Sequence, residues 1–201
     1  MRCVVFVDYS YFAAITLSEL KSAEWLVQNI KSWTGQDFAG ADWLVNVYDA
    51  QFDSKHRAFV PPRLRYQADV ELKRIAKSGC KLRLGEYALR FQQGGRMTKF
   101  HNPGEPFFVQ KGVDSLLVVD AMRELYGGAE CLFFITNDRD FIPLFKEIVG
   151  ARKRRRLFLF FSAVAGESED IISLVGRDFV FDISNKEWLP SKVRSEREGS
   201  R

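Results

Sequence analysis

Three aspartates directly follow apolar segments that read as strands. Asp8 follows a strand predicted over residues 3–7, and Asp138 and Asp140 follow another over residues 131–136. The apolar residues can be buried, but the charged residues after them cannot, so both strands must reach the surface at these acids. If the strands are parallel neighbours, their carboxyl ends bring the three carboxylates to one edge of a sheet.

A fourth aspartate, Asp114, lies at the start of the helix that precedes the second of these strands. Asp114 has helical spacing to Leu117, Ala121 and Leu125, which predicts that its carboxylate points along the buried face of that helix. We therefore expect three separate segments of the chain to place acids in one crevice.

Carboxylates gathered in a crevice repel each other, and a divalent cation relieves that repulsion. Mg²⁺ prefers oxygen ligands and often takes only one or two protein carboxylates together with waters and a substrate phosphate. Such an ion can activate a water and stabilise charge on a phosphodiester. The predicted chemistry is phosphoryl hydrolysis, with Asp8, Asp114, Asp138 and Asp140 as candidate metal ligands and catalytic residues.

Each acid also has a structural alternative. Asp114 can be a helix N-cap or an acid of the first turn, and Asp140 can cap the helix that carries Pro143. Asp8 fits a capping role less well, because bulky aromatic residues follow it. Thr136 and Asn137 can either polarise the loop or hold the carboxylates through hydrogen bonds. A lone Asp-x-Asp is weak evidence, and its agreement with Asp8 and Asp114 strengthens it.

Basic residues provide candidates for phosphate binding. The densest run covers residues 152–156, and the candidate contacts in the chain are Lys111, Arg139, Arg152, Lys153, Arg154 and Arg155. The alternative for the run is a solvated loop that protects an edge strand from aggregation, and for Lys111 a solvated lysine. The net charge of +4 is modest, so it is informative only where the basic residues cluster. This cluster supports a phosphate-rich partner and a solvated loop equally.

Strand and helix signals alternate along the chain, which predicts an α/β domain with a mostly parallel central sheet and helices on both faces. The predicted strands cover residues 3–7, 43–49, 81–91, 131–136, 157–161 and 179–183, and the helices cover 22–33, 64–76, 114–126, 141–149 and 170–175. A turn at 92–95 predicts an inserted hairpin that returns through 96–100. We assign residues 1–190 to one domain and expect a disordered charged tail over 191–201.

Composition excludes several classes of protein. The 201 residues are enough to bury a hydrophobic core without disulfides or bound metals. No apolar run approaches the length of about 20 residues that spans a bilayer. The N-terminus does not resemble a secretory signal, so we expect a cytoplasmic protein. Three widely spaced cysteines indicate buried free thiols, and two histidines lack zinc spacing.

Three segments, VVFVDYSYF, QKGVDSLLVVDAM and CLFFITNDRDFIPLF, resemble the signature segments of the NYN family, also called LabA-like, within the PIN-like nuclease superfamily. The resemblance covers about residues 1–185. It implies a PIN-like three-layer α/β/α domain and a ribonuclease that depends on Mg²⁺ or Mn²⁺. It also implies an acidic pocket formed by Asp8, Asp114, Asp138 and Asp140.

The first motif departs from the family pattern, because Tyr9 and Tyr11 replace the usual glycine and asparagine after the first aspartate. The change narrows the mouth of the pocket and removes a hydrogen bond, although either tyrosine could instead stack on a base.

Three hypotheses follow, in this order. The first is an endoribonuclease acting on single-stranded or structured RNA. The second is an RNA-binding regulatory module with little or no turnover. The third is a nucleotide-sugar transferase using the Asp-x-Asp, which leaves Asp8 unexplained. The sequence leaves open whether two copies pair as a homodimer.

Overall fold

The computed structural model describes residues 1–16, 20–35, 38–53, 55, 60, 62–66, 70–91, 106–151, 156–161 and 168–189. Eight strands in this part of the chain form one sheet, in the order β4-β3-β2-β1-β5-β6-β7-β8. The strands are β1 (Arg2–Asp8), β2 (Asp42–Phe52), β3 (Lys81–Phe91), β4 (Pro106–Lys111), β5 (Cys131–Ile135), β6 (Arg156–Phe161), β7 (Val180–Asp182) and β8 (Glu187–Trp188). Only the outer pairs, β3 with β4 and β7 with β8, are antiparallel.

The order of the strands reverses at β1. From β1 the chain adds β2, β3 and β4 on one side, and it then continues with β5 to β8 on the other side. The parallel neighbours β1 and β5 are in register from Cys3 opposite Cys131 to Val7 opposite Ile135, so their carboxyl ends lie side by side. In open α/β sheets such a switch point is where ligands usually bind.

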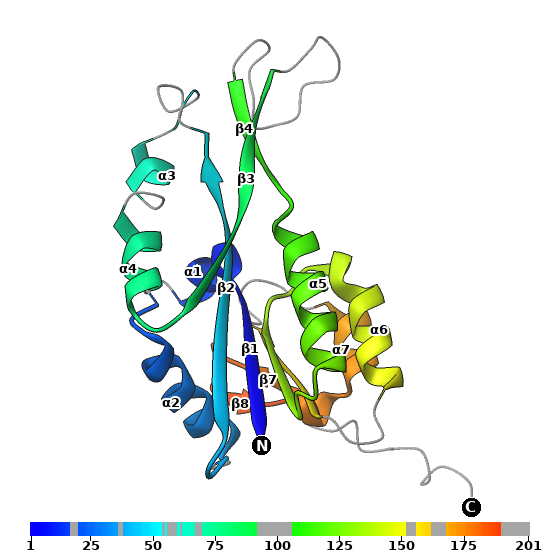
Figure 1. Ribbon diagram of the computed structural model, residues 1–201. Coiled ribbons are helices and arrows are strands. Elements are labelled where there is room, and N and C mark those ends of the chain that lie inside the picture. The colour runs from blue at the N-terminus through cyan, green and yellow to red at the C-terminus, as the bar shows by residue number, and fades with distance from the viewer. Residues whose placement is uncertain are drawn as a thin grey trace, which may run out of the picture.

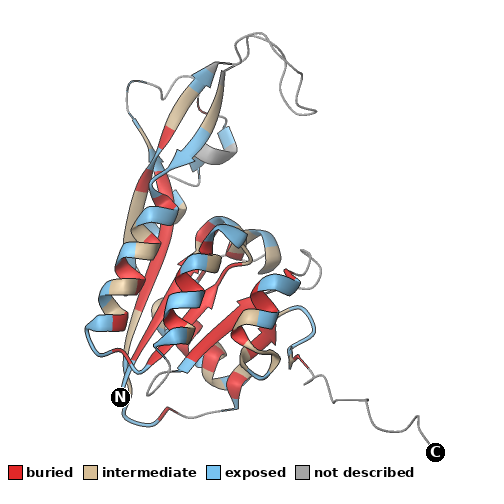
Figure 2. Cartoon of the chain, turned by 90° about the vertical axis from the view of Figure 1, so that its right-hand side faces the viewer, coloured by how far each residue is buried: buried red, intermediate tan, exposed pale blue. Residues whose placement is uncertain are grey.

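Alternation along β1 explains why helices cover both faces of the sheet. Val4 and Phe6 share a core with α5 (Val113–Tyr126), α6 (Ile142–Gly150) and α7 (Glu169–Val175). Cys3, Val5 and Val7 belong to the opposite core, with α1 (Tyr9–Thr16), α2 (Ala23–Thr34) and α4 (Leu72–Lys77). Figures 1 and 2 show the buried strands between these two groups of helices. The predicted α/β architecture with a mostly parallel sheet is therefore confirmed.

Local signals explain where α2 begins and ends. The Ser22 side chain accepts a hydrogen bond from the Trp25 amide at 3.0 Å, and Gly35 has the left-handed conformation after the last turn. Leu26 and Ile30 point into the core, as the predicted spacing requires.

Two predictions fall partly on residues that the structure does not describe. The helix expected over 64–76 is represented by α3 (Pro62–Tyr66) and α4, while residues 67–69 lie outside the described part. The expected turn at 92–95, the returning strand at 96–100 and the tail at 191–201 also lie outside it. Within the described part, β3 pairs with β4 over residues 86–91, whereas its pairing with β2 ends at Tyr87, so a two-stranded ribbon extends from the sheet (Figure 1).

Gly85 allows the β4–α5 junction to cross β3 closely. A Cβ built on Gly85 would lie 2.3 Å from the carbonyl oxygen of Lys111 and 2.8 Å from the amide nitrogen of Val113. We therefore expect Gly85→Ala to lower the free energy of unfolding by about 1–3 kcal/mol, because backbone atoms must move to accept the methyl group. Urea denaturation would measure the loss. Gly150→Ala provides a control, because its Cβ meets no atom within 4 Å.

All three cysteines are buried free thiols, as predicted. No helix in the described ranges has the length and apolar character needed to cross a membrane.

Candidate functional site at the carboxyl ends of β1 and β5

Thr136 links the two loops that carry Asp8 and Asp138. Its hydroxyl donates to Oδ2 of Asp8 at 3.4 Å and accepts the backbone N–H of Asp138 at 3.2 Å. Thr136 is fully buried, so its hydroxyl is held in place by the surrounding protein. The acids at the ends of β1 and β5 therefore meet, as the parallel-strand argument predicted.

Two of the four predicted acids, Asp8 and Asp114, have raised pKa values to which neighbouring carboxylates contribute. Burial, together with the charges of Asp114, Asp138 and Asp49, raises the pKa of Asp8 to about 6, against the opposing effect of the Tyr11 N–H. Burial also raises the pKa of Asp114, with added repulsion from Asp138 and Asp140. The cluster thus holds more negative charge than its own hydrogen bonds neutralise.

Two of the acids also cap helical turns. Oδ1 of Asp8 accepts the backbone N–H of Tyr11 at 3.2 Å, at the start of α1. Oδ1 of Asp138 accepts the backbone N–H of Asp140 at 2.9 Å, at the start of the 3₁₀ turn Arg139–Phe141. Asp140 is exposed and does not make the expected cap, because α6, the helix that carries Pro143, begins after Phe141 without a side-chain cap.

The prediction that Asp114 points along the buried face of its helix is wrong. Asp114 is exposed in the first turn of α5, whereas its neighbour Val113 is buried together with Leu117 and Ala121. Leu117, Ala121 and Leu125 are buried as predicted, but Val113 and Asp120 rather than Asp114 complete the buried face. Asp114 therefore lies at the rim of the acidic cluster.

Asp49 is a member of the site that the sequence reasoning missed. It lies on β2, is 1% exposed, and contributes to the raised pKa of Asp8. The Gln110 side-chain amide donates to Asp49 Oδ1 at 3.0 Å and also contacts the hydroxyl groups of Tyr87 and Ser10, at 2.9 and 3.2 Å. The sequence does contain a signal for this residue, because Asp49 is the last residue of the strand predicted over 43–49.

Tyr9 cannot stack on a base as one expectation proposed. It is 1% exposed, and its hydroxyl donates to Glu71 at 3.2 Å. Burial, followed by the negative charge of Glu71, raises its pKa. Tyr11 is half-buried and packs against both hydrophobic cores.

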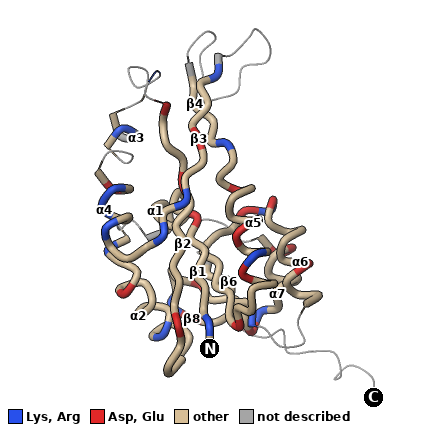
Figure 3. The backbone as a smooth tube through the Cα atoms, in the orientation of Figure 1, with Lys and Arg blue, Asp and Glu red and all other residues tan. Residues whose placement is uncertain are grey.

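The candidate cations have different environments. Lys111 is exposed at the end of β4, next to the start of α5. Arg139 is exposed and forms an ion pair with Asp170 of α7. The residues 152–155 lie outside the described part of the chain. Figure 3 shows further basic positions along α3 and α4.

The donors available to a metal here are carboxylate and hydroxyl oxygens, which suit Mg²⁺ or Mn²⁺. Within the described residues, no three His, Cys, Asp or Glu side chains are already arranged as a direct metal site. A hydrated ion needs only one or two of these carboxylates, and the raised pKa of Asp8 favours a nearby positive charge. The donor set therefore fits such an ion.

Comparison with known proteins does not assign the chain to a family. No family model matches it, and neither does any curated protein. A crystal structure of a protein of unknown function from Vibrio parahaemolyticus is similar over 94% of this chain and 96% of that one. The two chains share 13% sequence identity, with a TM-score of 0.49.

Proposed function

We propose that the protein is a metal-dependent ribonuclease, with an endonucleolytic mode of cleavage and a PIN-like NYN domain. The supporting observation is the electrostatic coupling of Asp8 to Asp114 and Asp138 at the switch point of the sheet. Helix capping alone does not require acids from distant segments to lie close together. The mutual repulsion of such acids costs folding free energy, which a bound cation would offset.

The four acids of the proposed site divide into an inner and an outer pair. Asp8 and Asp138 are partly buried and oriented by Thr136, so they are the best candidates to hold Mg²⁺ or Mn²⁺. Asp114 and Asp140 are exposed and can orient the attacking water or its metal-bound shell. When bound, the ion would supply a water of lowered pKa and stabilise charge at phosphorus.

Lys111 is the described cation best placed to contact the RNA backbone beside the acids. It lies three residues before Asp114, and α5 begins just after it. Its ammonium group can bind a phosphate oxygen and so hold the strand against the acidic edge. The run at 152–156 is the candidate for contact with a more distant part of the RNA, because its last residue, Arg156, begins β6 at the opposite edge of the sheet from the acids.

The direct test is cleavage of labelled single-stranded and structured RNA in Mg²⁺, Mn²⁺ or EDTA. We expect internal cleavage with either metal, none in EDTA, and a loss of at least about 10²-fold in Asp138→Asn. An asparagine still accepts the Asp140 N–H, so the variant should melt within a few degrees of the wild type. Unchanged turnover in folded Asp138→Asn would refute the proposal.

One observation favours the alternative of an RNA-binding module without turnover. Tyr9, which replaces the glycine of the family motif, fills core volume, and Asp8 and Asp138 keep roles as caps. This alternative predicts RNA binding that weakens steeply with salt, with no product at any concentration of Mg²⁺ or Mn²⁺.

A further inference from the structure

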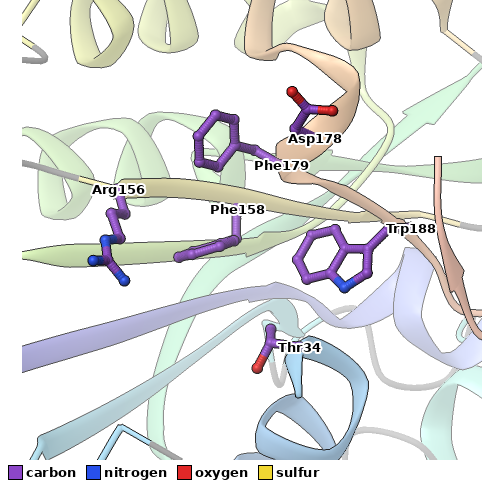
Figure 4. Close-up of a pocket in the computed structure, with 6 residues that line it drawn as sticks. All are labelled: Thr34, Arg156, Phe158, Asp178, Phe179 and Trp188. Atoms are coloured by element: carbon purple, nitrogen blue, oxygen red, sulfur yellow. The ribbon is translucent and has the colours of Figure 1, made fainter. Parts of the chain in front are cut away.

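The structure contains a cavity of about 430 Å³, whose lining residues are drawn in Figure 4. The cavity lies at the amino end of the parallel strands, because Arg156 begins β6, and so at the opposite edge of the sheet from the acidic cluster. Its lining residues are Thr34, Arg156, Phe158, Asp178, Phe179 and Trp188. Arg156 is the first residue of β6, which ends at Phe161. At about 3.3 Å per residue, the strand separates the cavity from the carboxyl edge by roughly 15 Å.

Three aromatic rings form the apolar part of this cavity. The ring centroid of Phe158 lies 6.0 Å from that of Phe179, with 63° between the planes, and 6.0 Å from that of Trp188, with 53°. Phe158 is 2% exposed and stacks on Phe133 with centroids 4.9 Å apart, so it lines the cavity without offering an open ring face. Phe179 and Trp188 are half-buried and can still contact a ligand. Trp188 also packs edge-on against Phe181, with centroids 5.4 Å apart, so this wall is held by the core.

Polar groups complete the lining. Arg156 is exposed and lies on one side of the cavity in Figure 4, with Trp188 on the other side and Phe158 between them. Asp178 adds a carboxylate beside Phe179. The Thr34 hydroxyl donates to the Ile30 carbonyl at 2.8 Å, and its oxygen can still accept a hydrogen bond. The cavity therefore has a cation at one end and rings with an acceptor at the other.

We propose that this cavity binds a nucleoside monophosphate. The base would pack against the half-buried rings of Phe179 and Trp188, and the phosphate would bind Arg156. Arg156 can keep an existing partner and still bind the phosphate, because a guanidinium carries five N–H donors. Asp178 would accept N–H groups of the base, and this favours guanine, which presents two neighbouring donors.

The size and charge of the cavity favour a whole nucleoside monophosphate over a nucleoside or a phosphate alone. A volume of about 430 Å³ falls in the range of small-molecule and cofactor sites. Inorganic phosphate would contact Arg156 but not the rings of Phe179 and Trp188, and a nucleoside would contact these rings but not the guanidinium. We therefore expect both fragments to bind at least tenfold more weakly than the nucleotide.

The experiment is calorimetric titration of the full chain with guanosine 5′-monophosphate, guanosine and inorganic phosphate, in EDTA. Arg156→Ala is expected to weaken binding of the nucleotide at least tenfold, and Phe179→Leu several-fold. Lys146→Ala removes an exposed positive charge from α6 and serves as the matched control, with unchanged binding. Circular dichroism melts would show that each variant is folded.

Asp138→Asn distinguishes this cavity from the proposed RNA site. Its binding of guanosine monophosphate should equal that of the wild type, whether or not the wild type cleaves RNA. Failure of the wild-type chain to bind the nucleotide would overturn the assignment. Binding that Arg156→Ala and Phe179→Leu both leave unchanged would also overturn it, because the ligand would then lie elsewhere.

Discussion

Asp8→Asn is expected to abolish RNA cleavage and, in EDTA at pH 8, to make the protein more stable than the wild type. The loss of cleavage, at least about 10²-fold, follows from removing an inner carboxylate of the proposed metal site. The gain in stability follows from the raised pKa of Asp8, which means that folding opposes its ionisation. Asparagine keeps an acceptor for the Tyr11 N–H and carries no charge.

The sign of the pH dependence follows from linkage. The pKa of Asp8 is raised from 3.8 to about 6, so between these values the folded protein binds more protons than the unfolded chain. The contribution of Asp8 to stability is therefore present below pH 3.8 and lost as the pH rises through 6. The rise of this pKa from 3.8 to about 6 corresponds to about 2–3 kcal/mol, or a rise in Tm of about 4–12 °C for the variant at pH 8.

Thermal melts of both proteins from pH 4 to pH 8 would measure this difference, which should shrink steadily as the pH falls. Asp42→Asn is the matched control, because Asp42 is exposed at the start of β2, away from the cluster. Added Mn²⁺ should stabilise the wild type and leave Asp8→Asn unchanged, since only the former retains both inner carboxylates. A stability difference independent of pH would show that folding does not raise the pKa of Asp8. Full RNA cleavage by Asp8→Asn would exclude Asp8 from catalysis.

The elements that the sequence predicted well are those that depend on local pattern. β1 and β5 are continuous apolar runs that end in acids, and their residues are buried throughout the interior of each strand. Because parallel strands share one carboxyl edge, the meeting of Asp8 with Asp138 followed from the strand assignments alone. Thr136 was named as a candidate support for the carboxylates, and it hydrogen-bonds to both loops.

The features that the sequence did not predict depend on register and packing between distant segments. Asp49 joins the site because β2 places it one residue beyond Tyr48, the partner of Asp8, and because β4 brings Gln110 onto it. Tyr9 is buried, and its hydroxyl donates a hydrogen bond to Glu71, which lies 62 residues away in the sequence. No periodicity within one segment carries this information, since it arises only when the strands and helices pack together.

Asp120 joins α5 to the sheet, and its replacement by alanine should cause the largest loss of stability among the single changes considered. Its carboxylate, 4% exposed, accepts Arg83 Nε at 2.6 Å, the Tyr48 hydroxyl at 3.2 Å and Arg123 Nη1 at 3.1 Å. Asp120→Ala would leave the fully buried Tyr48 hydroxyl and the Arg83 guanidinium without this acceptor. We expect a loss of about 2–4 kcal/mol, moderated because the Arg83 side chain is 29% exposed.

Urea denaturation would measure the loss, with Glu169→Ala as the matched control. Glu169 pairs with Arg177 at the surface, at 2.7 Å, and its removal should cost less than about 1 kcal/mol. Replacing both members of the buried pair, in Asp120→Leu with Arg83→Met, should recover part of the loss, since the one cation left without this partner, Arg123, is 64% exposed.

A loss for Asp120→Ala no larger than that of Glu169→Ala would show that the buried network does not hold α5. α5 carries Asp114 in its first turn, so a weaker hold on the helix also affects the acidic cluster. Asp120→Ala should therefore lower RNA cleavage even at temperatures where the variant is folded, whereas Glu169→Ala should not. The buried ion pair, two helical turns from Asp114, then acts as a positioning element for the acid at the rim of the site.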